Sequence, residues 1–465
     1  MTRRDAMWPT GEFRVLAPTT ELAIPTAWPG SAPRAGTPVR SGDVLLEGGA
    51  PGAADGAAGE PWPRTPVSGT VVGLREVPRT DGRRTWAVVV QPGPFQHDLA
   101  PRLSPRPFSE QLLEILGHPE DKREAWAEGL WQSGAAVDRP STPSLARQLE
   151  LALRRPSPVD HVLVTAMDPD PRLSVLGNLL DAATPDLVAG AFVLVRLSAA
   201  GRLVFVVEPC VPERVRREVS RLAAEGSRLG VAVGLRVASR VVTMSNTYPD
   251  AFPPLVVRRV LGRRVPGRGT AEDLSAAGVL LLDAAAAIAV GRVVRSDQPV
   301  LQVPLGVYDH RVDGGVCVRV PVGMSVREVL AGLGAAGATA HEVHPLSGVE
   351  LRRGDVLQEL KVPPEAVVTG SDLYLHALAE APARPADACV RCGWCIEACP
   401  TGVNPAAVLE GVQVGRSMGV GFAREVSAAG VGRCVECGLC QYVCPSRLPL
   451  LSAMRAGLME VRVSS

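Results

Sequence analysis

The chain has 465 residues, and its 49 Lys and Arg against 48 Asp and Glu give a formal net charge of +1, which offers no electrostatic case for nucleic-acid binding. Aromatic residues make up only 4 %, while 47 Gly and 42 Pro favour turn-rich β structure and linkers. The most apolar run, residues 276–290, is short and interrupted by Asp283, so we expect no transmembrane segment. The first 20 residues carry no signal-peptide pattern, which predicts a cytoplasmic protein.

Short strand-like segments with glycine turns occupy the first 100 residues. They are Val39–Leu46, Pro66–Gly73 and Thr85–Val90, with a Gly- and Ala-rich loop over residues 48–60. This pattern predicts a barrel-sandwich hybrid of the kind found in biotinyl and lipoyl carriers. A carrier presents a lysine at its hairpin tip, but the turn here is Ser68-Gly69 and the chain's only lysines are Lys122 and Lys361. We therefore expect a docking or structural module and not a swinging arm.

Residues 105–300 alternate between helical and strand-like signals. The helical segments are Ser109–Leu116, Arg123–Trp131, Ser144–Arg154, Leu173–Arg196 and Glu213–Leu229, and the apolar strand-like runs are Val162–Ala166, Leu203–Val207 and Gly278–Leu282. This alternation predicts an α/β domain in which helices cover a sheet.

Residues 301–380 contain a strand, a turn and a helix within the run Val318–Leu330. We expect Ser325 to cap that helix and Glu328 to complete a capping box. The strand–helix order favours a β-grasp module, making the whole chain a multidomain α/β and α+β protein. A Pro- and Ala-rich linker, Ala381–Asp387, leads into the last domain.

Eight of the ten cysteines lie near the C-terminus in two runs of the form C-x-x-C-x-x-C-x-x-x-C-P. The first run is Cys389, Cys392, Cys395 and Cys399, and the second is Cys434, Cys437, Cys440 and Cys444. Three thiolates two residues apart can wrap around three corners of an iron–sulfur cube, while the fourth ligates the other cluster in two-cluster ferredoxins. The spacing therefore predicts two 4Fe–4S clusters and single-electron transfer.

Crossed ligation gives each cluster ligands from both runs. One cluster is assigned Cys389, Cys392, Cys395 and Cys444, and the other Cys434, Cys437, Cys440 and Cys399. Gly393 and Gly438 follow the second cysteine of each run, where a residue without a side chain lets backbone N–H groups approach cluster sulfurs.

Zinc and disulfides are the alternatives for these cysteines. Structural zinc sites use paired C-x-x-C or Cys/His knuckles, which the two four-cysteine runs do not match. Disulfides need an oxidising compartment, which the N-terminus does not indicate. Cys210 and Cys317 stand alone in apolar stretches, and we expect them to be buried packing residues.

Several blocks outside the cysteine runs carry a family resemblance over nearly the whole chain. They are Pro66–Val71, Thr247-Tyr-Pro-Asp250, Leu261–Pro266, Val320–Leu330 and the ending Leu448-Pro-Leu450 after the last Cys-Pro-Ser. These blocks resemble RnfC, the C subunit of Rnf-type ion-translocating electron-transport complexes, and its relative PduS, the cobalamin-reductase flavoprotein of propanediol microcompartments. The sandwich-first domain order favours RnfC.

The resemblance implies four domains. They are a barrel-sandwich hybrid (residues 1–100), a complex-I-flavoprotein-like NADH/FMN-binding α/β domain (105–300), a soluble-ligand-binding β-grasp (SLBB) domain (301–380) and a ferredoxin-type domain with two 4Fe–4S clusters (381–465).

The second of these domains departs from the family pattern at its polar positions. The family's glycine-rich loop, Gly-Gly-Ala-Gly-Phe-Pro-Thr, approaches flavin or dinucleotide phosphate through backbone amides, and of the matching residues 133–143 only Gly134 keeps the pattern. Asp138 in that segment would repel phosphate. The family's acidic Glu-Cys-Glu-Pro loop becomes Asp168-Pro-Asp-Pro171, and an Asn-containing segment facing the nucleotide becomes Asp283–Ala287. We infer that this domain survives as a scaffold without NADH or flavin.

A second interpretation stays open, in which Arg139, Ser141 and Thr142 donate to the phosphate of a retained FMN. Three functions follow from these alternatives. The chain is an electron-transfer subunit, a self-contained NADH-oxidising flavoprotein, or a cobalamin-reductase-like shuttle of a bacterial microcompartment. Its expected partners are a donor flavoprotein or ferredoxin and an acceptor, either membrane-complex subunits or microcompartment enzymes. Its expected place is the cytoplasm, the inner face of the membrane or a microcompartment.

Overall fold

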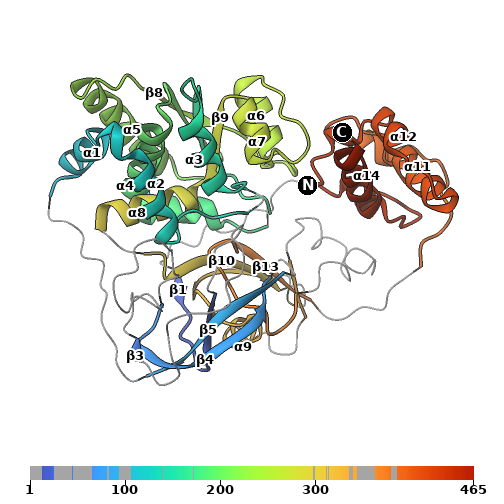
Figure 1. The fold of residues 1–465 in the computed structure, drawn as a ribbon, viewed down its shortest axis with the longest axis horizontal. Helices are drawn as coiled ribbons and strands as arrows, with labels where there is room; N and C mark the ends of the chain where they lie inside the picture. Colours follow the sequence, from blue (N-terminus) through green and yellow to red (C-terminus); the bar gives the residue numbers. More distant parts are fainter. Residues whose placement is uncertain are drawn as a thin grey trace.

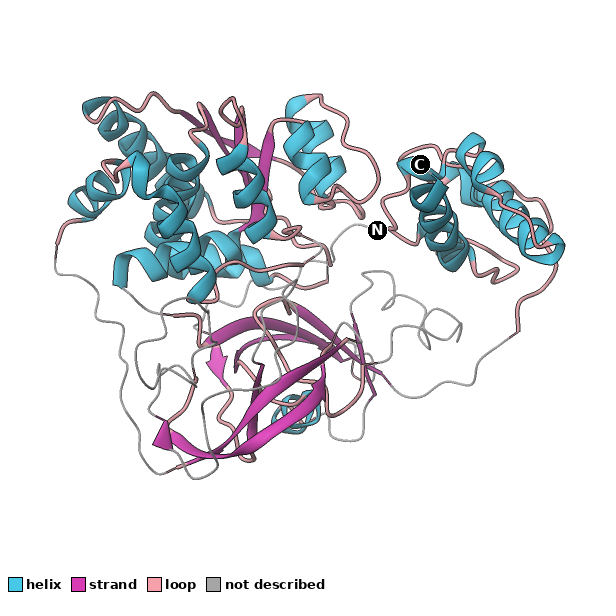
Figure 2. Cartoon of the chain, viewed as in Figure 1, coloured by secondary structure: helices cyan, strands magenta, loops and turns pink. Residues whose placement is uncertain are grey.

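The structure, a computed structural model, describes residues 13–25, 44–45, 65–80, 83–93, 106–139, 141–170, 172–296, 299–309, 312, 314–334, 339–342, 362–378 and 385–464. These residues form a β-rich body, a parallel α/β body and a helical C-terminal body (Figures 1 and 2). The expected mixed α/β fold is confirmed at this level. The loop expected over residues 48–60 lies outside the described residues.

The N-terminal sheet is antiparallel in the order β2-β5-β4-β3. Its strands are β2 (Leu22–Pro25), β5 (Arg84–Pro92), β4 (Gly69–Pro78) and β3 (Val44–Leu45). Alternate residues of β2 and β5 lie in two cores: Ile24 packs with Val88 and Val90, while Ala23 packs with Ala87 and Val89. Both faces of the sheet thus carry buried apolar side chains.

A five-stranded sheet joins the first and third segments of the chain in the order β1-β11-β10-β13-β12. Its strands are β1 (Arg14–Val15), β11 (Gly314–Pro321), β10 (Gln302–Asp309), β13 (Tyr374–Leu378) and β12 (Thr339–Glu342), and α9 (Val326–Gly332) follows β11. Because β1 pairs in parallel with β11, the N-terminal segment is part of the third module's sheet.

The capping box expected at α9 is only half present. The Ser325 hydroxyl accepts a hydrogen bond from the Glu328 backbone N–H at 3.3 Å, as expected. The Glu328 carboxylate, however, accepts from the hydroxyls of Thr19 and Thr20 at 2.8 and 2.9 Å. These two threonines arrive from the N-terminal segment, so the carboxylate joins two modules and does not close its own helix.

The α/β body has a parallel sheet in the order β8-β7-β6-β9. Its strands are β6 (His161–Thr165), β7 (Arg202–Val207), β8 (Ala238–Thr243) and β9 (Val279–Asp283). Its helices are α1 (Phe108–Leu116), η1 (Glu120–Lys122), α2 (Arg123–Gln132), α3 (Leu145–Arg154), α4 (Val175–Ser198), α5 (Glu213–Ala232), α6 (Pro253–Leu261), α7 (Ala271–Ala276) and α8 (Ala284–Ser296).

Both faces of this sheet are covered, because apolar side chains point to each. Val162 and Phe205 pack in the core under α1, α4, α5 and α8, whereas Leu163 and Val204 pack in the core under α6 and α7. Helices on both faces are what a parallel sheet requires.

One described helix is long and apolar enough to cross a membrane by length and composition, and the sequence expectation overlooked it. Helix α4 has 24 residues, and its most apolar 18-residue window has a mean hydropathy of 1.4. The apolar run at residues 276–290 is instead divided between β9 and α8. Length and composition alone single out α4, and 78 % of its apolar window is buried inside the protein.

The C-terminal body is a set of short helices that packs against one end of the α/β body (Figure 1). Its helices are α10 (Trp394–Glu397), α11 (Pro405–Met418), α12 (Ala423–Ala428), η3 (Val431–Arg433), α13 (Leu439–Tyr442) and α14 (Leu450–Ser464). Asn404 caps α11 by accepting from the Ala407 N–H at 3.1 Å, with Pro405 at the first helical position. Val408, Val426 and Met454 belong to the core of this body.

Candidate metal centres

The two cysteine runs share the same pattern of backbone conformation. Each residue with a left-handed φ in the first run has a counterpart 45 positions later: Arg391 and Glu436, Gly393 and Gly438, Gly402 and Arg447. Gly393 (φ 80°) and Gly438 (φ 73°) precede α10 and α13, which explains why glycine follows the second cysteine of each run. Arg391 (φ 56°) and Glu436 (φ 54°) hold the same conformation without that freedom. Sequence reasoning missed both, because neither residue type signals a left-handed turn.

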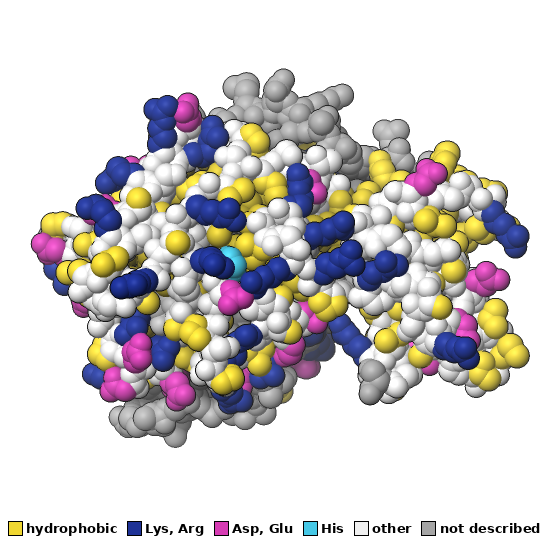
Figure 3. All heavy atoms as spheres, turned by 90° about the horizontal axis from the view of Figure 1, so that it is seen from above, with side chains coloured by type: hydrophobic (Ala, Val, Ile, Leu, Met, Phe, Trp, Pro, Cys, Tyr) yellow, Lys and Arg dark blue, Asp and Glu magenta, His cyan; other side chains and the backbone are white. Residues whose placement is uncertain are grey.

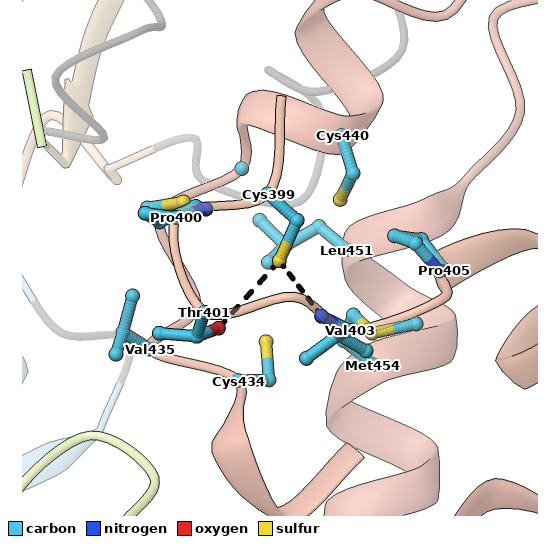
Figure 4. Close-up of a pocket in the computed structure, with 12 residues that line it drawn as sticks. Cys399, Pro400, Thr401, Val403, Pro405, Cys434, Val435, Cys440, Leu451 and Met454 are labelled. Carbon is cyan, nitrogen blue, oxygen red and sulfur yellow. Dashed lines mark hydrogen bonds between the residues drawn. The ribbon is translucent and has the colours of Figure 1, made fainter. Parts of the chain in front are cut away.

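Four cysteines from both runs line one pocket. Cys399 of the first run and Cys434, Cys437 and Cys440 of the second surround it, together with apolar side chains such as Leu451 and Met454. In Figure 4 the sulfur atoms of Cys399, Cys434 and Cys440 point into the same space. This is the ligand set that crossed ligation predicts for the second cluster, and the structure brings all four thiols together.

No group of three His, Cys, Asp or Glu side chains that could hold a single metal ion is present in the described ranges. A four-iron cube binds one thiolate at each of its four corners. The four cysteines that line the pocket supply that number of ligands.

Backbone N–H groups already donate to two of these sulfurs. The Val403 N–H donates to the Cys399 Sγ at 3.2 Å, and the Glu436 N–H donates to the Cys434 Sγ at 3.3 Å. Such bonds stabilise a thiolate and help set the reduction potential of a cluster bound to it. They also explain why Glu436 adopts a left-handed conformation, which turns its N–H toward the sulfur.

Burial favours the protonated form of three pocket thiols, those of Cys434, Cys437 and Cys440, when no metal is bound. It raises the pKa of Cys434 to about 12 and that of Cys437 to about 11, and it raises the pKa of Cys440 still further. Cluster binding at these residues must therefore displace protons, because only thiolates ligate iron.

The ligands assigned to the first cluster are less enclosed. Cys389 and Cys392 are exposed, Cys395 is half-buried and Cys444 is buried. Cys395 and Cys444 lie in one apolar cluster with Leu409 and Leu450. Burial raises the pKa of Cys395. Two of the four expected ligands, Cys395 and Cys444, therefore share one apolar cluster, while Cys389 and Cys392 lie at the surface.

The second run is fixed against the α/β body. The Tyr248 hydroxyl donates to the Cys437 backbone carbonyl, and Tyr248 packs with Val435 and Cys437. The buried Glu436 carboxylate pairs with Arg455 Nε at 3.0 Å and with Arg268 Nε, from the α/β body, at 3.5 Å. The turn that carries the second run thus lies at the interface between the C-terminal body and the α/β body.

The residues that the second interpretation assigns to a flavin phosphate instead contact a carboxylate of the chain itself. Arg139 Nε lies 2.9 Å from Asp283 Oδ2, as an ion pair and not as an aligned hydrogen bond. The Ser141 and Thr142 hydroxyls each donate to the same oxygen at 2.7 Å, and the Ala286 N–H at the start of α8 donates to Oδ1 at 2.8 Å. The Arg139 guanidinium, the two hydroxyls and the N-terminus of α8 together form a site suited to an anion. The Asp283 carboxylate is the anion that binds there.

Asp138, expected to repel phosphate, is also engaged within the chain. Its Oδ1 accepts from the Ser144 backbone N–H at 2.9 Å. The loop that replaces the family's glycine-rich segment therefore bonds to two carboxylates of the chain. Asp138 lies within the loop, and Asp283 lies at the end of β9. The loop's donors point at Asp283 and not at an open nucleotide site.

The acidic loop likewise faces the neighbouring sheet. Asp168 Oδ1 accepts from the Tyr374 hydroxyl at 2.6 Å, and Asp170 Oδ2 pairs with His376 Nε2 at 2.9 Å and with Arg172 at 2.7 Å. Tyr374 and His376 belong to β13. Burial alone would raise the pKa of Asp170, but His376 and Arg172 outweigh it and hold this pKa well below its ordinary value. Both carboxylates therefore hold the α/β body to the five-stranded sheet.

The two isolated cysteines differ from each other. Cys317 is half-buried on β11, and burial raises its pKa to about 12, which agrees with a packing role. Cys210 is exposed, and its thiol donates to Glu208 Oε2 at 3.5 Å. The expectation of a buried Cys210 was wrong, because the strand ends at Val207 and Cys210 lies in the turn beyond it.

Comparisons with known proteins agree with the resemblance noted from the sequence. Residues 385–448 match the family model of the 4Fe-4S dicluster domain. The C subunit of the ion-translocating oxidoreductase complex of Rhodobacter capsulatus is 25% identical over 258 residues, covering 55% of this chain and 46% of that protein. The corresponding C subunit of Pseudomonas aeruginosa is 26% identical over 370 residues, covering 79% and 43%. The chain thus spans less than half the length of these two relatives.

A shorter relative is covered more fully. The C subunit of the Na(+)-translocating ferredoxin:NAD(+) oxidoreductase complex of Acetobacterium woodii is 22% identical over 375 residues, covering 80% of this chain and 77% of that protein. The resemblance to RnfC-type subunits and the 4Fe–4S cofactor class are thereby confirmed. A chain of an NAD+-reducing NiFe hydrogenase aligns with a TM-score of 0.43 at 12% identity over 79% of this chain and 58% of that one, too weak a likeness to carry an argument.

Proposed function

We propose that this homologue of the C subunit of ion-translocating oxidoreductase complexes relays single electrons through two 4Fe–4S clusters, as a component of a larger oxidoreductase complex. The observation that carries the proposal is the position of Cys399, which belongs to the first run but lines a pocket with three cysteines of the second. Crossed ligation of this kind places two clusters side by side, as electron exchange between them requires.

The proposed ligand sets are those of crossed ligation. Cys434, Cys437, Cys440 and Cys399 hold one cluster, and Cys389, Cys392, Cys395 and Cys444 hold the other. Each cluster, when bound, accepts and passes on one electron. The Val403 and Glu436 N–H groups stabilise the electron-rich sulfurs, and the apolar wall of Leu451 and Met454 limits access of water.

The α/β domain serves in this proposal as a scaffold that binds neither FMN nor NADH. Asp283 already occupies the donors that a flavin phosphate would need, and Asp168 and Asp170 are engaged by β13. The residues present do not fit the nucleotide, so electrons reach the clusters from another protein.

The finer domain assignment belongs to the same proposal. It comprises a barrel-sandwich hybrid over residues 1–100, a degenerate nucleotide domain over 105–300, an SLBB domain over 301–380 and a cluster domain over 381–465. The partners are a donor and an acceptor protein. The chain works at the cytoplasmic face of an ion-translocating membrane complex, or inside a microcompartment.

Cofactor content of protein purified and reconstituted without oxygen tests this function. We expect about eight irons per chain, on the basis of two four-iron clusters, and cluster signals in electron paramagnetic resonance after reduction with dithionite. We expect no flavin fluorescence in the supernatant of denatured protein. One equivalent of FMN with bleaching of the visible spectrum by NADH would contradict the scaffold, and about four irons would contradict the second cluster.

A further inference from the structure

A band of arginines crosses the face of the α/β body on which α6 lies. The arginine band consists of Arg202, Arg240, Arg258, Arg263, Arg264 and Arg268, of which all but Arg263 are exposed and Arg263 is half-buried. Seen from above, Lys and Arg side chains follow one another across this side of the molecule toward the C-terminal body (Figure 3).

Strand register and hydrogen bonds explain why these residues share a face. Arg240 pairs with Val204 and Arg202 lies two residues before Val204, so both arginines point to the sheet face that α6 covers. Arg240 Nη2 donates to the Val260 carbonyl near the end of α6 at 3.4 Å. Arg263, just after α6, donates to the Ala277 carbonyl at 2.6 Å.

Acidic groups neutralise only part of the band. Asp160 pairs with Arg263 at 2.7 Å and Glu436 pairs with Arg268 at 3.5 Å. Among the described residues, Arg202, Arg258 and Arg264 form no ion pair with a carboxylate. Each carries a full positive charge into solvent, which gives the face a positive potential.

His161, at the start of β6, lies within this positive field. Burial lowers its pKa, the charges of Arg263, Arg202 and Arg240 lower it further, and Asp160 opposes them. His161 is also the register partner of Arg202 across β6 and β7, so it lies beside the band.

The band ends at the second cysteine run. The Gly267 N–H donates to the Gly432 carbonyl at 3.0 Å, and Gly432 lies two residues before Cys434. Arg268 pairs with Glu436, which stands between Cys434 and Cys437. A molecule bound along the band would thus have one edge beside the cluster that Cys399 and the second run hold.

We propose that the arginine band is the docking surface of a small acidic electron-carrier protein. The carrier passes one electron to the cluster of the second run and is itself oxidised by one electron, with no bond made or broken. This inference rests on the proposed relay function. A nucleic acid or an anionic membrane would also be attracted to the band, but neither gains from its continuity with a cluster.

Stopped-flow reduction of the reconstituted full chain by a reduced plant-type 2Fe–2S ferredoxin, an acidic carrier, tests the proposal. We expect the second-order rate constant to fall steeply with ionic strength, as steered association does. Arg258→Glu and Arg264→Glu should each lower it about threefold to tenfold at low salt. Arg228→Glu is the matched control, because Arg228 is an exposed arginine on α5, on the opposite face of the sheet.

Reduction by the methyl viologen radical cation separates docking from the relay itself. A cationic donor should reduce the band variants at least as fast as the parent protein, with iron content unchanged. Equal effects of Arg264→Glu and Arg228→Glu on the ferredoxin rate would overturn the docking proposal while leaving the relay intact. So would band-dependent binding to phosphatidylglycerol vesicles or duplex DNA without a change in the ferredoxin rate. Failure of both donors to reduce the parent protein would instead refute the relay.

Discussion

Asp283 is a buried carboxylate that the chain satisfies entirely from within. It is fully buried at the end of β9, where it pairs with Arg139 and accepts from Ser141, Thr142 and the first turn of α8. A buried ion pair contributes little net stability when complete, but loss of one partner leaves the other charge uncompensated. The stability of this loop therefore depends on the carboxylate being present.

Asp283→Ala should lower the free energy of unfolding by about 3–5 kcal/mol, because Arg139 and two hydroxyls lose their partner. Chemical denaturation followed by circular dichroism measures the change, with iron content checking that the C-terminal body still forms. A loss below about 1 kcal/mol would show that the donors find another acceptor and that Asp283 does not close this site.

Residue types and spacing in the sequence predicted the donors of this site but not their acceptor. Only the second interpretation, a retained FMN, had Arg139, Ser141 and Thr142 face a phosphate, and Asp283 lies more than a hundred residues farther along the chain. Only the fold brings the end of β9 to that loop. By contrast, the cysteine spacing is a local signal, and the four cysteines that it assigns to the second cluster all line one pocket.

Close helix packing in the α/β body depends on glycine. A Cβ on Gly190 of α4 would lie 1.9 Å from the Ala287 carbonyl of α8, and one on Gly291 of α8 would lie 1.9 Å from the Asp186 carbonyl of α4. Backbone atoms cannot move aside as a flexible side chain can. The two helices therefore approach closely only because both positions lack a side chain.

Gly190→Ala should destabilise the protein by about 1–3 kcal/mol through overpacking. Gly129→Ala is the matched control, since Gly129 also lies in a helix but a Cβ there meets nothing within 4 Å. The control should be neutral or stabilise by about 0.5–1 kcal/mol, because alanine is the better helix former. Thermal unfolding of both variants compares them directly, and equal melting temperatures would argue against tight α4–α8 packing.

Element prediction succeeded where the periodic signal was strong. Helices α1 to α5 and strands β6, β7 and β9 begin and end within three residues of their expected bounds. Strand β8 was missed, because its sequence Ala-Ser-Arg-Val-Val-Thr lacks a continuous apolar run and none of its residues is fully buried. The pairing of β1 with β11 was also missed, since no local pattern encodes a contact between residues three hundred positions apart.

Across the whole molecule, the α/β body and the five-stranded sheet meet at buried titratable groups. Asp170 and His376 are both fully buried, and burial lowers the pKa of His376 below its ordinary value of 6.5. The folded chain therefore binds a proton at His376 less readily than the unfolded chain does. Stability from this group is complete above pH 6.5 and is lost as the pH falls below it.

The free energy of unfolding should thus fall between about pH 7 and 5, with His376 contributing at most about 1.4 kcal/mol per pH unit. His376→Gln keeps a donor for Asp170 but removes the titration, so its curve should be flatter. His118 and His161 also have lowered pKa values and leave a residual slope. Chemical denaturation at several pH values measures this dependence. Identical slopes of the free energy of unfolding against pH for parent and variant would exclude His376 as a source of the pH dependence.

One spectroscopic comparison distinguishes crossed ligation from ligation of each cluster by a single cysteine run. Cys399→Ser, Cys437→Ser and Cys392→Ser are each reconstituted without oxygen, reduced with dithionite and examined by electron paramagnetic resonance. Serine ligates iron poorly, because its alkoxide forms only far above neutral pH. If Cys399 serves the cluster of the second run, Cys399→Ser should lose the same signal as Cys437→Ser and keep the signal that Cys392→Ser loses. Loss of the Cys392-dependent signal in Cys399→Ser would contradict the account.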